Sequence, residues 1–346
     1  MNIKSSNVVY IVGAGLSAGL GFPTIHNLLP GLWERLHTKD ADDLARVIRF
    51  HHPDFNASRI NSYPTIEHFL SEIKANEDLF QSTRSAVGGF TADELLQRRS
   101  ILLYELSEWF HELKAKALRV RPDWLIHLTA AMKDERASVI SFNWDLVLDE
   151  LLFGDDLSKS SYGLDRRRAG VRLIKPHGSL NWYKGDISGS LKKARKFPLA
   201  GVGDSAVFAF RPLRAPRSSQ GRRYMPLIVP PVYSKQFEGP LFRKLWQESV
   251  SVLSNATEVR FIGFSLAEAD FHARFVLRCG FYNQEQGYLK ENGRRSTPAG
   301  RAEVTIVDPS DEPHERIRKL VGWECVSQKK KVSEWIADGG LQVMRG

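Results

Sequence analysis

The chain has 346 residues, of which 42% are hydrophobic and 26% are charged, and its formal net charge is +9. This composition is typical of a globular protein and excludes wholesale disorder, collagen and a coiled coil. Two cysteines, Cys279 and Cys325, are too few for a disulfide framework or a four-cysteine zinc site. We therefore expect a cytoplasmic protein without zinc, although histidine ligands for a metal stay open.

Short apolar runs rich in β-branched residues recur along the chain and predict strands buried on both faces. The first is Val8–Val12, which is too short for a signal peptide, and no run reaches the ~20 apolar residues that span a bilayer. Five similar runs follow, at 138–141, 171–174, 227–229, 259–262 and 304–307. Helical patterns between most of them predict a doubly wound, mostly parallel α/β sheet of the Rossmann-like kind.

A glycine-rich turn follows the first strand directly, with the sequence Gly13-Ala14-Gly15-Leu16-Ser17-Ala18. It fits the dinucleotide fingerprint G-x-G-x-x-G/A, in which Gly13 allows a tight turn and Gly15 lets the backbone approach a pyrophosphate. The following helix would offer free N–H groups to the phosphates. The alternative is a glycine-rich turn without a ligand.

The acidic residue that normally holds the ribose in this fingerprint is missing from its usual context. Glu34 has the spacing, but it lies in a helical pattern and not at the end of a second strand. A second glycine cluster, Gly19 to Gly21, predicts a loop beside the phosphates. Phe22 in that loop would cover a ring of the ligand or pack in the core.

The stretch from residue 24 to 122 has helical spacing and few strand candidates. We expect helices at 42–50, 65–74 and 92–118, the last opened by a capping box from Thr91 to Glu94. The predicted organisation is a Rossmann-like core of residues 1–23 and 123–346, interrupted by a helical insertion subdomain of residues 24–122. This subdomain would cover the carboxyl edge of the sheet.

Polar residues follow two of the predicted strands, at the carboxyl edge where open α/β sheets bind ligands. Asn143 and Asp145 come after the strand at 138–141, and His177 comes after the strand at 171–174. Asn143 could hold a water or a ribose hydroxyl, and Asp145 could orient a partner or cap the next helix. His177 could be a structural histidine, or an acid or base near neutral pH.

Two later strand ends complete the candidate set. Gly263 allows close backbone approach, and Ser265 offers a hydroxyl to ribose or phosphate. Asp270 then opens a helix, where an acidic side chain is favourable for electrostatic reasons alone. Asp308 ends the last predicted strand. It is a candidate to contact the adenosine part of the dinucleotide, which Glu34 is not placed to bind.

One segment carries nearly all of the excess positive charge. Residues 184–225 contain ten lysines and arginines against two aspartates, which gives +8 of the total of +9. We expect a basic, loop-rich insertion within the core that contacts nucleic acid, an acidic partner or phosphates. The alternative is a merely solvated insertion.

Taken in order, these motifs resemble those of the sirtuin-like family. The matching residues are Gly13–Ser17, Gly21 and Pro23, Ser141–Asp145, His177-Gly178, Gly263–Ser265 and Val307–Pro309. Within that family, the residues that look most like the bacterial NAD-hydrolase domains of anti-phage defence are Lys175–Trp182, Pro230-Pro231 with Lys235, and Gly263–Asp270. The zinc module of the deacylases, with its four cysteines, has no counterpart here.

The resemblance implies an NAD⁺ glycohydrolase that cleaves NAD⁺, as substrate, to nicotinamide and ADP-ribose. Asn143 would position water or a ribose hydroxyl, His177 would act as general base, and Asp145 would complete the catalytic set. The dinucleotide would be held by Gly13, Ala14, Gly15, Ser17, Phe22, Gly263, Ser265 and Asp308. Two alternatives stay open: a non-catalytic module that senses NAD or ADP-ribose or docks nucleic acid, and an NAD-dependent deacylase.

A hydrolase that depletes NAD must be held inactive until it is needed. No sensor domain is evident in the sequence, so the resemblance implies control by homo-oligomerisation or by a separate partner such as a translocase ATPase. We expect no membrane association.

Overall fold

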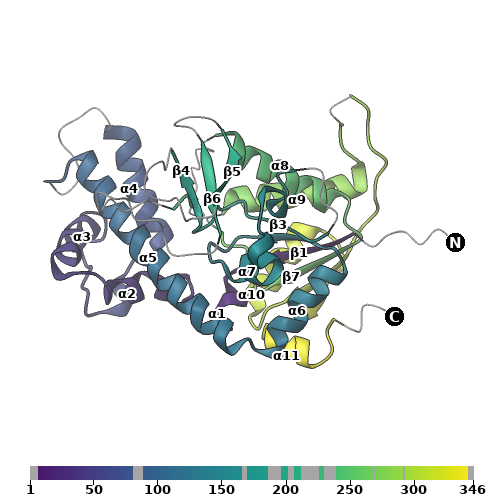
Figure 1. Cartoon of the computed structure of the whole chain (residues 1–346), viewed down its shortest axis with the longest axis horizontal. Coiled ribbons are helices and arrows are strands. Elements are labelled where there is room, and N and C mark those ends of the chain that lie inside the picture. Colours follow the sequence, from purple (N-terminus) through teal and green to yellow (C-terminus); the bar gives the residue numbers. More distant parts are fainter. Residues whose placement is uncertain are drawn as a thin grey trace.

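A six-stranded parallel sheet lies at the centre of the computed structural model (Figure 1). The structure describes residues 7–80, 89–165, 170–185, 196–201, 206–211, 226–229, 239–268, 270–290 and 293–341. The strands are β1 (Val8–Val12), β2 (Ser138–Ser141), β3 (Arg172–Ile174), β7 (Glu258–Ile262), β8 (Glu303–Val307) and β9 (Val326–Gln328). They follow the order β3-β2-β1-β7-β8-β9, which confirms the predicted α/β class and is the Rossmann strand order.

Strand β1 lies in the middle of this sheet, at the point where the strand order reverses. Its five residues are all buried, and it pairs in parallel with β2 on one side and β7 on the other. The register places Val12 opposite both Ser141 and Ile262. The carboxyl ends of the three strands therefore lie level, at the crevice where sheets of this kind bind ligands.

The core helices form two groups. In one, α6 (Asp123–Asp134) contacts α7 (Val147–Phe153) and α11 (Val332–Ala337); in the other, α9 (Phe271–Gln286) contacts α8 (Pro240–Ser254) and α10 (Asp311–Val321). Right-handed crossovers on the two sides of β1 put the two groups on opposite faces of the sheet. Figure 1 shows the sheet between α8 and α9 on one side and α6 and α11 on the other.

Helices α2 (Ile25–Trp33), α3 (Thr38–His51), α4 (Ile66–Phe80) and α5 (Ala92–Val120) form a layer beside the sheet (Figure 1). They confirm the three helices expected in this stretch, and Thr91 and Glu94 form the expected capping box. These helices share a hydrophobic cluster of their own, which also takes in Trp144, Leu180 and Ile228 from the core. The bounds of the subdomain stay a prediction.

A small antiparallel sheet accounts for the described part of the basic segment. Its strands are β4 (Trp182–Lys184), β5 (Lys196–Ala200) and β6 (Val207–Phe210), in the order β4-β6-β5. Most of the basic residues expected to contact a partner, and Pro230-Pro231 with Lys235, lie outside the described residues. The predicted strand at 227–229 is wrong, since only Ile228 forms a bridge, to Gly178.

The remaining elements are short. They are the helix α1 (Ala14–Ala18) and the 3-10 turns at Ile60–Ser62, Gly154–Asp156 and Lys159–Tyr162. Across the described ranges, none of the helices combines the length and the hydropathy needed to cross a bilayer.

Candidate functional site

The glycine turn after β1 packs directly against the turn after β7. The N–H of Gly13 donates to the Ile262 carbonyl at 3.1 Å, and the N–H of Gly15 donates to the Gly263 carbonyl at 2.8 Å. A Cβ on Gly15 would lie 2.8 Å from the Cα of Gly263, and one on Gly13 would lie 2.6 Å from its carbonyl oxygen. Glycine is required here because two backbones touch.

This packing corrects one expectation for the turn. Three of its N–H groups, on Gly13, Gly15 and Leu16, donate to backbone carbonyls and are not free for a phosphate. The helix behind them, α1, has only five residues, so its dipole is short. Ala14 and Gly15 are nevertheless exposed, and Ala14 lines a cavity.

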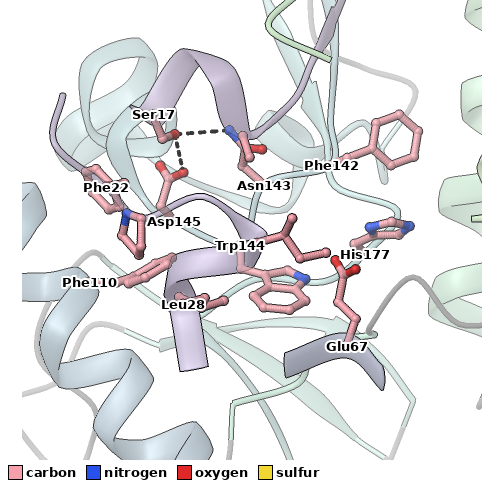
Figure 2. A pocket seen from close by; sticks show the side chains of 13 residues that line it. Ser17, Phe22, Leu28, Glu67, Phe110, Phe142, Asn143, Trp144, Asp145 and His177 are labelled. Carbon is pink, nitrogen blue, oxygen red and sulfur yellow. Dashed lines mark hydrogen bonds between the residues drawn. The ribbon is translucent and has the colours of Figure 1, made fainter. Parts of the chain in front are cut away.

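A cavity that is open to solvent lies between the sheet edge and the helical layer. Six residues singled out in the sequence line it together: Ala14, Ser17, Phe22, Asn143, Asp145 and His177. The opposite wall comes from α2, α4 and α5, and Figure 2 shows the two walls facing each other.

Asn143 and Asp145 are tied to the glycine turn through Ser17. The Ser17 hydroxyl donates to Asp145 Oδ2 at 2.6 Å, and Asn143 Nδ2 donates to Ser17 Oγ at 3.0 Å (Figure 2). Asn143 Nδ2 also donates to the Gly13 carbonyl at 2.9 Å. Asp145 Oδ1 also accepts the Val147 N–H at 3.0 Å, so this carboxyl group caps α7 as well. Asp145 therefore joins the glycine turn to the start of α7, and its role in catalysis stays a prediction.

Burial raises the pKa of Asp145, while Lys175 and the hydrogen bonds from Ser17 and Val147 oppose that rise. Asn143 is held differently. Its amide nitrogen is used by two protein acceptors, and no described residue donates to its amide oxygen. That oxygen is consequently the group of Asn143 that can accept a hydrogen bond from a ligand or a water.

A buried polar network beneath the cavity fixes the segment that carries Asp145. Lys175 Nζ donates to the Asp145 carbonyl at 2.6 Å, to Asp149 Oδ2 at 3.0 Å and to Ser179 Oγ at 2.8 Å. The Tyr162 hydroxyl donates to the other oxygen of Asp149 at 2.6 Å, and burial raises the pKa of Tyr162 well above its ordinary value. This buried network was not predicted, because the sequence around Asp149 indicates only a helix.

His177 is paired with a carboxylate from a distant part of the chain. Its Nε2 lies 2.9 Å from Asp270 Oδ2, and both side chains are buried. The His177 ring packs edge-on against Phe142, with ring centroids 4.9 Å apart, and against Trp246. Asp270 also caps α9 by accepting the Ala273 N–H at 3.1 Å, so its position at a helix start serves two purposes.

Two further residues that bring polar atoms to the cavity wall were not found from the sequence. Glu67, from the start of α4, lines the cavity, and Figure 2 shows its carboxylate directed toward His177. Trp144 also lines the cavity, and its buried Nε1 has no hydrogen-bond partner among the described residues. Nothing in the sequence spacing of Glu67 links it to His177, since only the folding of α4 over the sheet edge brings them together.

Phe22 packs in the core, as one of its two alternatives predicted, and its contact with a ring of the ligand stays a prediction. Its side chain is buried and meets Phe110 of α5 edge-to-face, with ring centroids 5.2 Å apart, and it also lines the cavity.

Besides Gly13 and Gly15 of the glycine turn, three candidates lie away from the cavity lining. Gly263 contacts the glycine turn, Ser265 is exposed, and Asp308 is buried at the end of β8. The Asp308 carboxylate accepts the Ser310 N–H at 2.9 Å, which is a capping contact at the start of α10. Their role toward a dinucleotide stays a prediction. Glu34, as expected, ends no strand and directly follows α2.

No family model matches the chain, and no curated protein matches it. Among solved structures, it is similar to a Sir2 enzyme (14% identity, 99% of this chain and 94% of that chain covered, TM-score 0.42). It is also similar to a Sir2 homologue in complex with NAD (14%, 99% and 90%, 0.41) and to a Sir2 homologue variant in complex with ADP-ribose (12%, 99% and 93%, 0.44).

Proposed function

We propose that the chain is an NAD⁺ glycohydrolase, which hydrolyses the bond between nicotinamide and ribose. The observation that carries this proposal is the convergence of Asn143 and the His177–Asp270 pair on one cavity beside the glycine turn. The motifs that resemble those of the sirtuin-like family suggest NAD⁺ as the substrate. The Rossmann strand order provides a crevice that suits a dinucleotide.

The reaction consumes water and NAD⁺ and yields ADP-ribose, nicotinamide and a proton. The Asn143 amide oxygen accepts a hydrogen bond from the attacking water. When His177 Nε2 carries a proton toward Asp270, the lone pair lies on Nδ1, and this nitrogen takes the proton of the water. Asp270 thus sets the tautomer and the orientation of the base, as a positioning residue.

The opposite wall of the cavity stabilises the positive charge that develops at the ribose. Cleavage of the bond gives the ribose oxocarbenium character, and the Glu67 carboxylate stabilises this positive charge across the cavity. The Trp144 indole N–H, buried without a described partner, donates a hydrogen bond to the carboxamide oxygen of nicotinamide.

By the same resemblance, the activity depletes NAD during phage infection, under the control of self-assembly or of a partner such as a translocase ATPase. The basic segment 184–225 is the part of the chain proposed to contact nucleic acid.

The test is nicotinamide release from NAD⁺ by the purified full chain, over a range of protein concentrations, with and without candidate partners. We expect release without any acyl peptide. His177→Ala and Asn143→Ala should each lower the rate at least about 100-fold, since acid–base catalysis contributes 10²–10⁴-fold. His127→Ala, at an exposed position on α6, is the matched control and should leave the rate unchanged.

Other outcomes separate the alternatives. Release that requires an acyl peptide would indicate a deacylase. Saturable NAD⁺ binding without release, under every condition of assembly, would indicate a sensing module. Release that survives in folded His177→Ala would remove the proposed base.

A further inference from the structure

Three histidines and one glutamate gather where α3 ends and α4 begins, outside the cavity described above. His51 and His52 end α3, and His68 and Glu72 lie one turn apart on α4. The chain between them includes the 3-10 turn at 60–62 and returns α4 beside the end of α3. The two histidines at the end of α3 and the two residues of α4 thus lie together, although they are 16 or more positions apart in the sequence.

The ligand-type atoms of this cluster are closely spaced. His52 Nε2 lies 3.0 Å from Glu72 Oε1, and His68 Nε2 lies 3.4 Å from the same oxygen. One nitrogen from each of these two histidines and one Glu72 oxygen all lie within 4.8 Å of one another. His51 Nδ1 is 4.0 Å from Glu72 Oε1.

These separations fit a tetrahedral metal. Zinc bonds to imidazole nitrogen and carboxylate oxygen at about 2.0–2.2 Å, so neighbouring ligands in a tetrahedron lie roughly 3.3–3.6 Å apart. The pairs that Glu72 makes with His52 and His68 are already close to that spacing, and small side-chain rotations would bring the remaining pairs to it.

The cluster is also accessible in the way that a bound ion requires. The side chain of Glu72 is 13% exposed and that of His52 is 28% exposed, whereas His68 is 63% exposed. An ion can therefore enter from solvent past His68 and reach a carboxylate held inside. Imidazole and carboxylate together suit Zn²⁺ and its neighbours among the divalent transition metals, and they do not suit Mg²⁺ or Ca²⁺.

We propose that His52, His68 and Glu72 bind a divalent transition-metal ion of the Zn²⁺ type, with His51 or a water as the fourth ligand. The ion fastens the end of α3 to the first turns of α4. Since Glu67 lies on the same turns of α4, the ion also steadies the helix that brings Glu67 to the cavity. Binding itself does not depend on the proposed hydrolase activity.

The test is titration of the chelator-treated full chain with Zn²⁺ by calorimetry, and with Co²⁺ by visible absorption. We expect one ion per chain, tetrahedral Co²⁺ bands and a higher Tm with Zn²⁺. His52→Ala, His68→Ala and Glu72→Gln should each weaken binding by about 100-fold or more, because the loss of a residue that merely positions a ligand already costs 10–100-fold.

His37→Ala, at the exposed opposite end of α3, is the control and should bind Zn²⁺ as the wild type does. His68→Ala is the variant that disturbs packing least, because the His68 side chain is largely exposed. Circular dichroism of each metal-free variant checks that the variant is folded. Absent saturable binding, or binding equally tight in folded His68→Ala, would overturn the metal site and would show the cluster to be a hydrogen-bonded His–Glu group only.

Discussion

Asp145 is the buried carboxyl group on which the geometry of Asn143 and Ser17 depends. Burial raises its pKa, so the folded chain holds this proton at a pH where the unfolded chain has already released it. A group of this kind lowers the free energy of unfolding as the pH rises from about 4, the ordinary value, toward the folded pKa. Its stabilising contribution is complete only below the ordinary value.

We predict that Asp145→Asn removes this part of the pH dependence. Relative to wild type, the variant should gain stability between about pH 4 and neutrality, by about 1.4 kcal/mol for each tenfold difference in acidity between the two states. Urea unfolding at a series of pH values measures the effect. The exposed Asp156→Asn should follow the wild-type curve, and parallel curves for Asp145→Asn and wild type would contradict the prediction.

At the scale of single elements, the turns after β1 and β7 make a close backbone contact beside the cavity. Gly263 has a φ of +55°, and a Cβ there would lie 2.5 Å from the Leu16 nitrogen and 2.6 Å from the Gly15 carbonyl carbon. Neither backbone atom can move without shifting β1 or α1. A side chain at this position therefore meets both an unfavourable φ and a steric clash.

We predict that Gly263→Ala destabilises the protein by more than about 2 kcal/mol, from about 1 kcal/mol for the left-handed backbone and 1–3 kcal/mol for overpacking. Gly163→Ala is the matched control, because Gly163 is in the left-handed region with a φ of +69°, and a Cβ there would meet no atom closer than 3.4 Å. It should cost only the first part. Chemical denaturation of both variants checks the difference, and equal losses would mean that the backbone contact is unimportant.

The sequence predicted those elements whose pattern reflects burial. Val8–Val12 and the runs near 140, 173, 260 and 305 are strands because parallel strands are covered on both faces and need continuous apolar runs. Strand β9 escaped notice because it is at the sheet edge and none of its residues is fully buried. The small sheet escaped notice because β5 carries Lys196 and Pro198.

Candidate site residues were predictable where they follow a strand of the parallel sheet. Asn143 and Asp145 follow β2 and His177 follows β3, and the carboxyl ends of parallel strands meet at one edge of the sheet. Asp270 was noticed only as a helix-start acid, and its partner could not be inferred. Glu67 was not found at all, because nothing in a helical stretch far from the strands indicates which turn will face the cavity.

At the scale of the whole molecule, the cavity belongs to two hydrophobic clusters at once. Phe142 is part of the sheet cluster, whereas Phe22, Phe110 and Trp144 belong to the cluster of the helical layer. The helices therefore supply one wall of the site, including its acid, Glu67.

We predict that Glu67→Gln lowers kcat for nicotinamide release by about 100-fold with a smaller effect on KM, because the carboxylate acts on charge that develops only in the transition state. Glu34→Gln, at an exposed position after α2, should leave both constants unchanged. Steady-state kinetics with NAD⁺ separates the two constants. A rise in KM alone would assign Glu67 to substrate binding instead.

The two outermost strands, β3 and β9, have three residues each. Edge strands this short expose few unpaired amide and carbonyl groups, so a strand of another chain could form few hydrogen bonds with them. Within the described residues, the six-stranded sheet therefore has no long edge strand onto which a second copy of this protein could extend a continuous intermolecular β-ladder.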